Sequence, residues 1–288
     1  MRLSLASNAG FEQPRERMMS GLVVVMPVYN NSPGLIKSLN SLVHESCSND
    51  FDVLLVDDSP APNLHCLDYS IYPFKVQVLT NGRNLGVTQS LNRALEWITK
   101  RNYALIARLD AGDSVVPGRF HKQRTHLETH ADCVLIGGAV DYVTPEGQKL
   151  YTFSPPIRDD ELRRKMHMNN YIAHPAAMMR LSAVLAVGGY RQAYPAAEDY
   201  DLFLRLAQIG KIANLSDVIL QYEISHSQIS LRKRRRQLQS RLLIQLNHFD
   251  GSQIESYLGL ATTTLAFAIP WKFIIWLKSM LQDIRAVA

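Results

Sequence analysis

Largely apolar segments that end in polar residues recur through the first half of this chain. The clearest lie at 22–28, 51–56 and 102–109. Apolar runs of this length are typical of strands buried on both faces of a parallel sheet. Segments with helical spacing, at 35–43 and 87–100, alternate with them. This order predicts an α/β fold with a mostly parallel sheet and right-handed crossovers.

Acidic residues follow two of these predicted strands. Asp110 and Asp113 come after the third apolar segment, and residues 57–58 are a second acid pair. Because the carboxyl ends of parallel strands meet at one edge of a sheet, we expect these acids to lie close together. Carboxylate oxygens are preferred ligands of Mg²⁺ and Mn²⁺, so Asp110 and Asp113 are a candidate metal site. The alternative is that Asp113 or Ser114 caps a helix beginning near Pro117, and the convergence of strand ends favours the metal.

The second half of the chain has a different pattern. Segments 133–143 and 149–153 flank a Pro-Glu-Gly turn and predict an antiparallel pair of strands. Residues 197–209 have helical spacing, with Glu198 and Asp199 in the first turn. A smaller antiparallel portion is therefore expected beside the parallel sheet.

Composition narrows the class of protein. A chain of 288 residues with 47% hydrophobic and 20% charged residues is ordinary for a globular protein. The three cysteines, Cys47, Cys66 and Cys133, have no zinc-like spacing, and their odd number argues against a disulfide framework, which indicates a reducing compartment. Residues 1–20 lack the apolar block of a signal peptide and are interpreted as a flexible cytoplasmic leader.

The last fifth of the chain is both basic and apolar. A dense basic run at 232–236 precedes an apolar stretch at 257–277. Its uncharged part is shorter than the roughly 20 residues that a spanning helix needs, and Pro270 interrupts it. We therefore expect residues 231–288 to form a helical tail that binds an anionic membrane surface, the alternative being a helical hairpin packed on the domain. Nucleic acid is disfavoured as a partner because no recognisable binding module accompanies the basic run.

Five motifs occur in order along the chain: Val-Met-Pro-Val-Tyr-Asn at 25–30, Val-Asp-Asp-Ser at 56–59, Asn-Gly-Arg-Asn-Leu-Gly at 81–86, Leu-Asp-Ala-Gly-Asp at 109–113 and Glu-Asp at 198–199. Together they resemble family 2 glycosyltransferases of the GT-A fold, of the bacterial type that builds lipopolysaccharide, capsule and O-antigen glycans. The resemblance implies a GT-A domain at 21–230. Its Rossmann-like nucleotide-sugar-binding half would cover 21–116, and its acceptor and catalytic half 117–230.

The resemblance implies that the first half binds a nucleoside diphosphate sugar. The implied contacts are Pro27, Tyr29, Asn30, Asp58, Arg83, Asn84 and Asp110. A carboxylate such as Asp58 can accept the N3–H of uracil or thymine, and the Tyr29 ring can stack on a base, so UDP- and dTDP-sugars are the expected donors. The alternatives are that residues 57–58 only form a turn and that Arg83 is simply solvated.

The resemblance also implies a divalent cation, Mn²⁺ or Mg²⁺, at Asp110 and Asp113. The family's motif is usually Asp-x-Asp-Asp, and this chain has Gly112 at the third position. Two carboxylates are enough where substrate phosphates and water complete the coordination.

The acid pair of the 197–209 helix resembles the family's catalytic pair, in which Asp199, beside Glu198, would be the general base of an inverting transfer. A carboxylate within hydrogen-bond reach can take the proton of an attacking hydroxyl. The alternative is that both acids only stabilise the helix dipole, by about 0.3–1 kcal/mol. His174 and His226 are candidate contacts of the acceptor or diphosphate, with a core histidine an equal alternative for His174.

These inferences predict a cytoplasmic enzyme, peripheral on the inner face of the cytoplasmic membrane, that transfers a hexosyl or deoxyhexosyl group to a surface glycan or lipid-linked acceptor. One alternative is a catalytically degenerate, membrane-tethered binding or scaffold subunit, for which Gly112 is the best support. Another is a sugar-nucleotide nucleotidyltransferase. Enzymes of that kind resemble a family with a glycine-rich phosphate loop after the first strand, and this chain has Tyr-Asn-Asn-Ser at 29–32 instead. A dehydrogenase is weaker still because no GxGxxG motif follows a strand.

Overall fold

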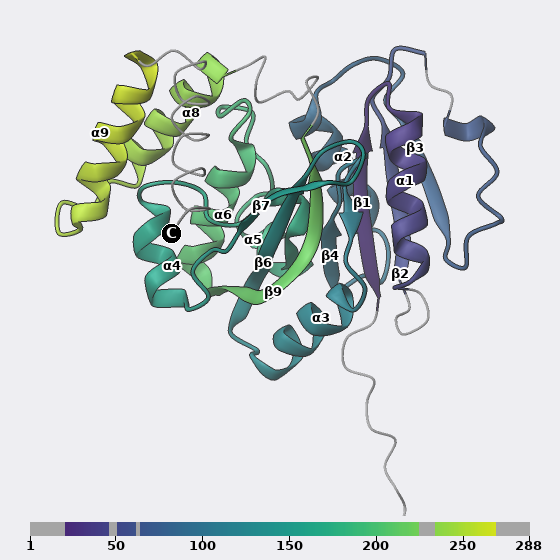
Figure 1. The fold of residues 1–288 in the computed structure, drawn as a ribbon, viewed down its shortest axis with the longest axis horizontal. Helices are drawn as coiled ribbons and strands as arrows, with labels where there is room; N and C mark the ends of the chain where they lie inside the picture. The colour runs from purple at the N-terminus through teal and green to yellow at the C-terminus, as the bar shows by residue number, and fades with distance from the viewer. Residues whose placement is uncertain (1–20, 46–50, 62–63, 225–233, 269–288) are drawn as a thin grey trace, which may run out of the picture.

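The computed structural model describes residues 21–45, 51–61, 64–224 and 234–268 (Figure 1). The predicted leader at 1–20, the candidate His226 and the apolar residues 269–288 lie outside this described part.

A mixed sheet of nine strands runs through the centre of the molecule. Its first four strands are parallel, in the order β3-β2-β1-β4, and are β1 (Leu22–Val28), β2 (Phe51–Asp57), β3 (Val76–Thr80) and β4 (Leu105–Arg108). The prediction of buried parallel strands is confirmed, and β1 and β2 are buried almost throughout. Because the four strands run the same way, the residues that follow them lie along one edge of the sheet.

The second half of the chain extends the same sheet. β8 pairs with β4 and with β6 in antiparallel fashion, β9 lies parallel to β6, and β7 pairs with β6 as the predicted antiparallel partner. The bounds are β5 (Ser114–Val115), β6 (Cys133–Val143), β7 (Lys149–Phe153), β8 (Met178–Arg180) and β9 (Lys211–Glu223).

The sequence does not predict β9. Asn214, Ser216 and Asp217 interrupt its apolar pattern, so neither alternation nor a continuous apolar run marks it as a strand. It forms through long parallel pairing with β6, with register shifts near Gly138. The strand ends at Glu223, beside Asp113.

Helices cover both faces of the sheet, and successive residues of β1 face two different cores. Leu22 and Val24 pack in the cluster that contains residues of α1 and α3, while Val23 and Val25 pack in the cluster with α2, α5 and α6. The helices are α1 (Ser32–Val43), α2 (Val87–Ile98), α3 (Arg119–Thr129), α4 (Asp159–Met166), α5 (Leu181–Ala186), α6 (Glu198–Ile209), α8 (Arg234–Asn247) and α9 (Ile254–Ala268), with 3₁₀ turns η1 (Leu64–Cys66) and η2 (His174–Ala176).

The amino end of α3 is capped from a distant part of the chain. The buried carboxylate of Glu45 accepts hydrogen bonds from the backbone N–H groups of Arg119, at 3.0 Å, and Phe120, at 2.9 Å. Gly118, at the N-cap position, contributes no side chain, and Asp113 accepts instead from the N–H of Glu223. The alternative in which Asp113 or Ser114 caps this helix is therefore wrong.

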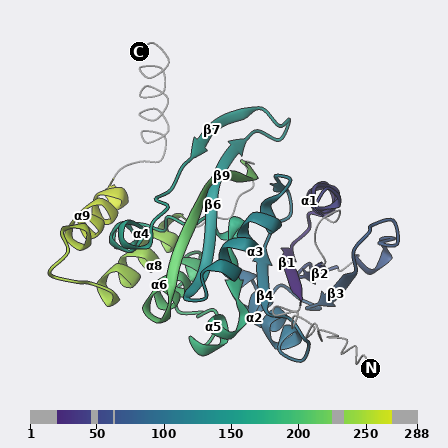
Figure 2. The same cartoon turned by 90° about the horizontal axis from the view of Figure 1, so that it is seen from below.

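The described part of the C-terminal region packs on the domain. Helices α8 and α9 lie beside α4 and α6, at the end of the molecule away from α1 and β3 (Figures 1 and 2). Ser240 donates to the carbonyl of Pro195 at 2.9 Å, and Gln245 donates to the carbonyl of Met168 at 2.8 Å. Within the described ranges, no helix has the length and apolar character needed to cross a membrane.

Replacing Glu45 by alanine tests the distant cap. The variant leaves two buried N–H groups of α3 without their acceptor, so Glu45→Ala is expected to lower the free energy of unfolding by about 2 kcal/mol. Chemical denaturation measures this. The control is Glu128→Ala, an exposed acid on the same helix, which is expected to change stability by less than about 0.5 kcal/mol. Equal effects of the two substitutions would contradict the cap.

Candidate functional site

The loop after β1 is built as a rigid turn. Asn30 has a φ of +48°, a conformation that asparagine tolerates better than most residues, and its N–H donates to Ser59 Oγ at 3.0 Å. Asn31 caps α1 through its bond from the N–H of Gly34, and its side-chain amide donates to the carbonyl of Ala111 at 2.8 Å. The Tyr29 side chain is 48% exposed at this edge, with a face available for a planar ligand.

Asp58 organises the 81–86 loop. One of its carboxylate oxygens accepts from Asn81 Nδ2 and from the N–H of Leu85, both at 2.7 Å, and the other accepts from the N–H of Gly86 at 2.9 Å. The loop is therefore held against the end of β2. Arg83 and Asn84, at its tip, are exposed.

The 110–113 turn is fixed from α1. Ser38 Oγ donates to the carbonyl of Asp113 at 2.7 Å and accepts from the N–H of Gly112 at 3.0 Å. Gly112 has a φ of +116°, which side-chain-bearing residues rarely adopt. The backbone conformation of the turn therefore explains why glycine occupies position 112 of the motif.

The two acids of this turn differ in environment. Asp110 is 42% exposed at its side chain, whereas Asp113 is buried. Asp113 Oδ1 accepts from the N–H of Glu223 at 3.0 Å, and its Oδ2 has no hydrogen-bond partner among the described residues. Burial, followed by the charge of Asp110, raises the pKa of Asp113 well above its ordinary value.

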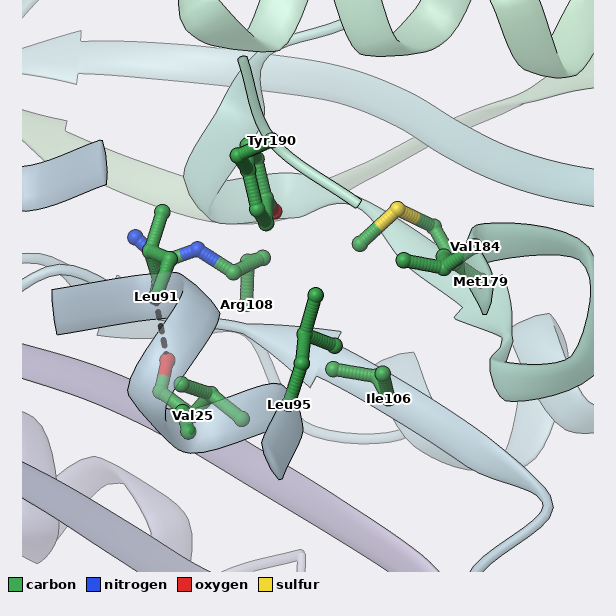
Figure 3. Close-up of a pocket in the computed structure, with 9 residues that line it drawn as sticks. Val25, Leu91, Leu95, Ile106, Arg108, Met179, Val184 and Tyr190 are labelled. Atoms are coloured by element: carbon green, nitrogen blue, oxygen red, sulfur yellow. Dashed lines mark hydrogen bonds between the residues drawn. The ribbon is translucent and has the colours of Figure 1, made fainter. Parts of the chain in front are cut away.

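A buried arginine lies directly beneath these acids. Arg108, the last residue of β4, is 1% exposed, and its guanidinium donates to Asp110 Oδ1 at 2.6 Å, to His174 Nε2 at 3.2 Å and to the carbonyl of Val25. Figure 3 shows the Arg108 side chain among the residues that line a small, mostly apolar cavity, with Tyr190 above it and Val25 below. Arg108 thus connects β1, the acid turn and the η2 segment.

His174 is part of this internal network. Its Nε2 faces both the Arg108 guanidinium and the Tyr190 hydroxyl, the latter at 2.9 Å. Burial and the charge of Arg108 hold the pKa of His174 well below its ordinary value, so the ring is neutral and accepts at Nε2. These contacts match the core-histidine alternative. A contact between His174 and a substrate stays a prediction.

Glu198 and Asp199 begin α6 as the sequence predicts. Asp199 Oδ2 accepts from Asn170 Nδ2 at 2.9 Å, while Glu198 Oε2 is buried and has no hydrogen-bond partner in the described structure. Burial raises the pKa of both carboxylates, and the charge of Asp110 raises them further. The acid turn and the α6 pair are therefore close enough to interact electrostatically.

A buried ion pair anchors this helix. Arg205 binds Asp201, one turn earlier on α6, at 2.6 Å, and also donates to the carbonyl of Gly189 at 2.8 Å. The contact ties the first turns of α6 to the segment that leads into Tyr190. Ala196, just before the helix, has a φ of +63°, an uncommon conformation for alanine.

Sequence reasoning missed the residues that support the acids. These are Arg108, Asn170, Tyr190, Lys37 and Glu223, the last two forming an ion pair at 2.6 Å beside Asp113. Arg108 offered a signal, because an arginine in an otherwise apolar strand next to Asp110 needs a buried acceptor. The other four come from distant segments and carry no local signal.

The residues also suit a divalent cation. Asp110 presents a partly exposed carboxylate, and Asp113 an oxygen without a partner in the described part. Oxygen ligands from one or two carboxylates are typical of Mg²⁺ sites that substrate phosphates complete. No group of three His, Cys, Asp or Glu residues that could hold a metal occurs in the described ranges, so a cation here depends on two protein ligands.

The fold and the acids define a glycosyltransferase of the GT-A type, with a parallel half-sheet that ends in acids and a second acid pair on α6. The model of Glycosyl transferase family 2 matches residues 23–188, more than half of the chain, and the chain belongs to this family.

Two similar proteins are named for amylovoran and O-antigen biosynthesis. The amylovoran biosynthesis glycosyltransferase AmsE of Erwinia amylovora is 28% identical over 216 residues, which cover 73% of this chain and 79% of AmsE. The O-antigen biosynthesis glycosyltransferase WbnJ of Escherichia coli is 26% identical over 219 residues, covering 72% of this chain and 81% of WbnJ.

Solved structures share the fold at low identity. TarS 1–349 of S. aureus, in complex with UDP-GlcNAc, aligns with a TM-score of 0.62 and 16% identity over 85% of this chain and 72% of its own. The mannosyltransferase PcManGT of Pyrobaculum calidifontis, in complex with GDP-Man and Mn²⁺, aligns with a TM-score of 0.59 and 16% identity over 90% of this chain and 79% of its own.

The network around Arg108 predicts that lysine cannot replace it. An ammonium group cannot donate to Asp110, His174 and the Val25 carbonyl in the planar arrangement of a guanidinium. We expect Arg108→Lys to lower turnover of a nucleotide-sugar donor about 10- to 100-fold, because a residue that orients a ligand carboxylate has effects of that size. Arg101→Lys, at an exposed arginine stacked on Trp97, is the control. Turnover at the wild-type level in a folded Arg108→Lys protein contradicts the positioning role.

The raised pKa of Glu198 predicts a pH-dependent stability difference. A carboxyl group whose pKa is higher in the folded than in the unfolded state favours folding at low pH and loses that contribution as pH rises through the folded-state pKa. We expect Glu198→Gln to unfold at a higher temperature than the wild type at about pH 8 and at nearly the same temperature at about pH 5. Calorimetry from about pH 5 to about pH 8 measures the unfolding temperatures, and Glu96→Gln, at an exposed residue, is the control. The same pH dependence in both variants would contradict the effect of burial on Glu198.

Proposed function

We propose that this protein is an inverting glycosyltransferase that moves a sugar from a nucleoside diphosphate sugar, UDP- or dTDP-linked, to a hydroxyl of a bacterial surface glycan or lipid-linked acceptor. The observation that carries the proposal is the grouping of acids around one buried arginine. Arg108 binds Asp110 and His174, and the charge of Asp110 acts on both Glu198 and Asp199, which supports an acid turn for the donor near an acid pair for catalysis. Membership of the family and the roles printed for AmsE and WbnJ support the reaction class and the kind of product.

In this proposal the donor lies across the carboxyl ends of β1, β2 and β4. Tyr29 stacks on the base, and Pro27 and Asn30 border it. Asp58 accepts the N3–H of the pyrimidine with its remaining lone pair while it holds the 81–86 loop, whose Arg83 and Asn84 face the donor. The fold neighbours TarS, in complex with UDP and with UDP-GlcNAc, and PcManGT, in complex with GDP-Man, support a nucleoside diphosphate sugar as the donor.

Asp110 and Asp113 hold the divalent cation, Mn²⁺ or Mg²⁺, in this proposal. The bound ion supplies charge stabilisation for the departing diphosphate. Arg108 fixes the orientation of Asp110, and the bond from Glu223 fixes one oxygen of Asp113 so that the other points to the ligand. The Mn²⁺ complex of PcManGT, whose fold is similar, supports a cation at this turn.

Asp199 is the proposed general base. The acceptor hydroxyl gives its proton to the Asp199 carboxylate as its oxygen attacks the anomeric carbon, the bond to the diphosphate breaks, and the configuration inverts. Asn170 and the backbone N–H groups of Asp199 and Tyr200 bind the Asp199 carboxylate and stabilise its ionised form, which a base needs. Glu198 lies next to it and lends negative charge, so it supports the base rather than replacing it.

The proposed location of the enzyme is the cytoplasmic side of the membrane, where nucleoside diphosphate sugars are made and lipid-linked acceptors are exposed. The C-terminal region, from residue 231, supplies the attachment in this proposal. No role for nucleic acid is proposed.

Calorimetric titration with UDP, dTDP and GDP, each with and without Mn²⁺, tests the donor site. We expect one pyrimidine diphosphate to bind, at least about tenfold more tightly with Mn²⁺ than without it, and Asp113→Ala to abolish the metal dependence. Failure of every nucleotide to bind the folded protein would overturn the donor assignment and favour the scaffold alternative.

Asp199→Asn tests the base separately. The amide cannot take a proton, so we expect transfer to fall by at least about 100-fold while UDP binding stays unchanged. The wild-type rate is expected to fall as pH drops through the raised pKa of Asp199, because the base must be ionised. Asp160→Asn, at an exposed acid of α4, is the control. Normal transfer by Asp199→Asn would remove this residue from the chemistry.

A further inference from the structure

Helix α9 directs its small and polar residues inward and its apolar residues outward. Ser256, Gly259 and Thr263 are buried against the domain. The exposed large side chains are Ile254, Tyr257, Leu258, Leu265 and Phe267, with exposed fractions of 65%, 52%, 44%, 60% and 41%. The spacing of the first four places them on one side of the helix, which we call the α9 outer face. A surface helix of a globular protein ordinarily has the reverse arrangement.

Helix α9 cannot rotate about its axis to bury its outer face against the domain. At Gly259 an added Cβ would lie 2.3 Å from the carbonyl oxygen of His167, so only glycine permits this approach of helix to backbone. Ser256 Oγ lies 3.1 Å from His167 Nδ1 on the same side. The close contact fixes the rotation of the helix and leaves its leucines facing outward.

Nothing in the described structure covers the α9 outer face. The helix is the outermost element at its end of the molecule in both views, beyond α8 and α4 (Figures 1 and 2). Phe249, after α8, contacts Tyr257 edge to face at 5.0 Å and continues the apolar surface. Exposed apolar surface of this kind marks a binding site for a partner or a membrane.

The charges around this face favour an anionic partner. Arg234 donates to the carbonyl of Ala266 at 2.7 Å, which places the basic run that includes Arg235 and Arg236 at the carboxyl end of α9. Glu255, the one acid within α9, is partly buried and lies 3.8 Å from Arg164. In sequence, residues 269–288 add Lys272, Lys278 and Arg285 against Asp283.

We infer that the α9 outer face, with the arginines at its carboxyl end, lies on the surface of an anionic lipid bilayer. Apolar side chains enter the headgroup region while neighbouring cationic side chains bind the lipid phosphates. The combination of outward leucines, an aromatic pair and a basic end suits such a surface better than a neutral protein groove. This inference assigns the membrane attachment of the proposed function to a particular surface of the protein. Only its connection with a lipid-linked acceptor rests on the proposed function.

The same helices contact the segments that carry the catalytic acids. Gln245 and Arg241 of α8 both donate to the carbonyl of Met168, two residues before Asn170, which binds Asp199. Ser240 holds the carbonyl of Pro195, just before α6. The α8 and α9 helices that would face the bilayer therefore pack against the segments that hold Asn170 and begin α6, which links the proposed membrane surface to the side of the proposed base.

Vesicle flotation of the full chain tests the inference. We expect the wild type to float with vesicles of phosphatidylcholine and phosphatidylglycerol, and to bind phosphatidylcholine alone much less. The double variant Leu258→Glu with Leu265→Glu is expected to bind the anionic vesicles at least about tenfold less tightly. The reason is that two apolar contacts are replaced by negative charges that the lipid phosphates repel. Arg235→Gln with Arg236→Gln is expected to weaken binding at low salt and to have little effect at high salt.

Two control variants separate this face from general surface charge. Leu185→Glu and Ile71→Glu add the same charge at exposed apolar residues of α5 and of the loop before β3, and both are expected to bind like the wild type. Undiminished binding by the α9 double variant overturns the inference and assigns the contact to another part of the chain. A wild type that ignores anionic vesicles overturns it too, and a dimer that the double variant dissociates then identifies a second copy as the occupant.

Titration of the same variants with UDP keeps the two proposals apart. All are expected to bind UDP as the wild type does, since none touches the donor side. Vesicle binding without UDP binding would support the α9 surface and contradict the proposed donor site. UDP binding without vesicle binding would support the donor site and contradict the α9 surface.

Discussion

The Arg108 guanidinium is a positive charge removed from water, and the arrangement of the site depends on how that charge is compensated. A buried arginine is tolerated where its charge is compensated and its nitrogens have acceptors, and here each of the three nitrogens has one, from His174, the Val25 carbonyl and Asp110. Each acceptor belongs to a different part of the site. The electrostatic requirement of one side chain therefore keeps the end of β1, the acid turn and the η2 segment in a fixed relation.

The acids gain from the same arrangement. Burial is the main reason why the pKa values of Asp113, Glu198 and Asp199 are raised, and the negative charge of Asp110 raises all three further. Arg108 offsets part of this effect, since its charge acts to lower the pKa of Glu198. Acids with raised pKa values that lie together in this way are typical of functional sites.

Much of this architecture could be predicted from the sequence, and the failures have physical causes. The parallel strands β1, β2 and β4 and the acids that follow them are encoded locally, as continuous apolar runs that stop at carboxylates. Helix α6 is encoded by its periodic leucines. By contrast, β9 has a mixed polar pattern and exists because β6 offers it a partner, and Glu45 caps α3 from far away in sequence. Pairing and capping across such distances leave no local pattern to read.

The support of the site was the least predictable part. Asn170 reaches Asp199 and Glu223 reaches Asp113 only after the chain has folded. The orientation of α9 was hidden for the same reason, because the close approach at Gly259 decides which side faces outward. The apolar content of that helix was visible in the sequence, and its direction was not.

The backbone at Gly112 bears on whether the family's usual aspartate could stand at this position. There is space for a Cβ, since the nearest atoms lie 3.8 Å and 4.0 Å away, but a φ of +116° suits glycine alone. The hydrogen bonds from Ser38 and Asn31 hold that conformation. An aspartate at position 112 would therefore be strained unless the bonds from Ser38 and Asn31 also changed, so the shape of the turn, and not a lack of space, selects glycine here.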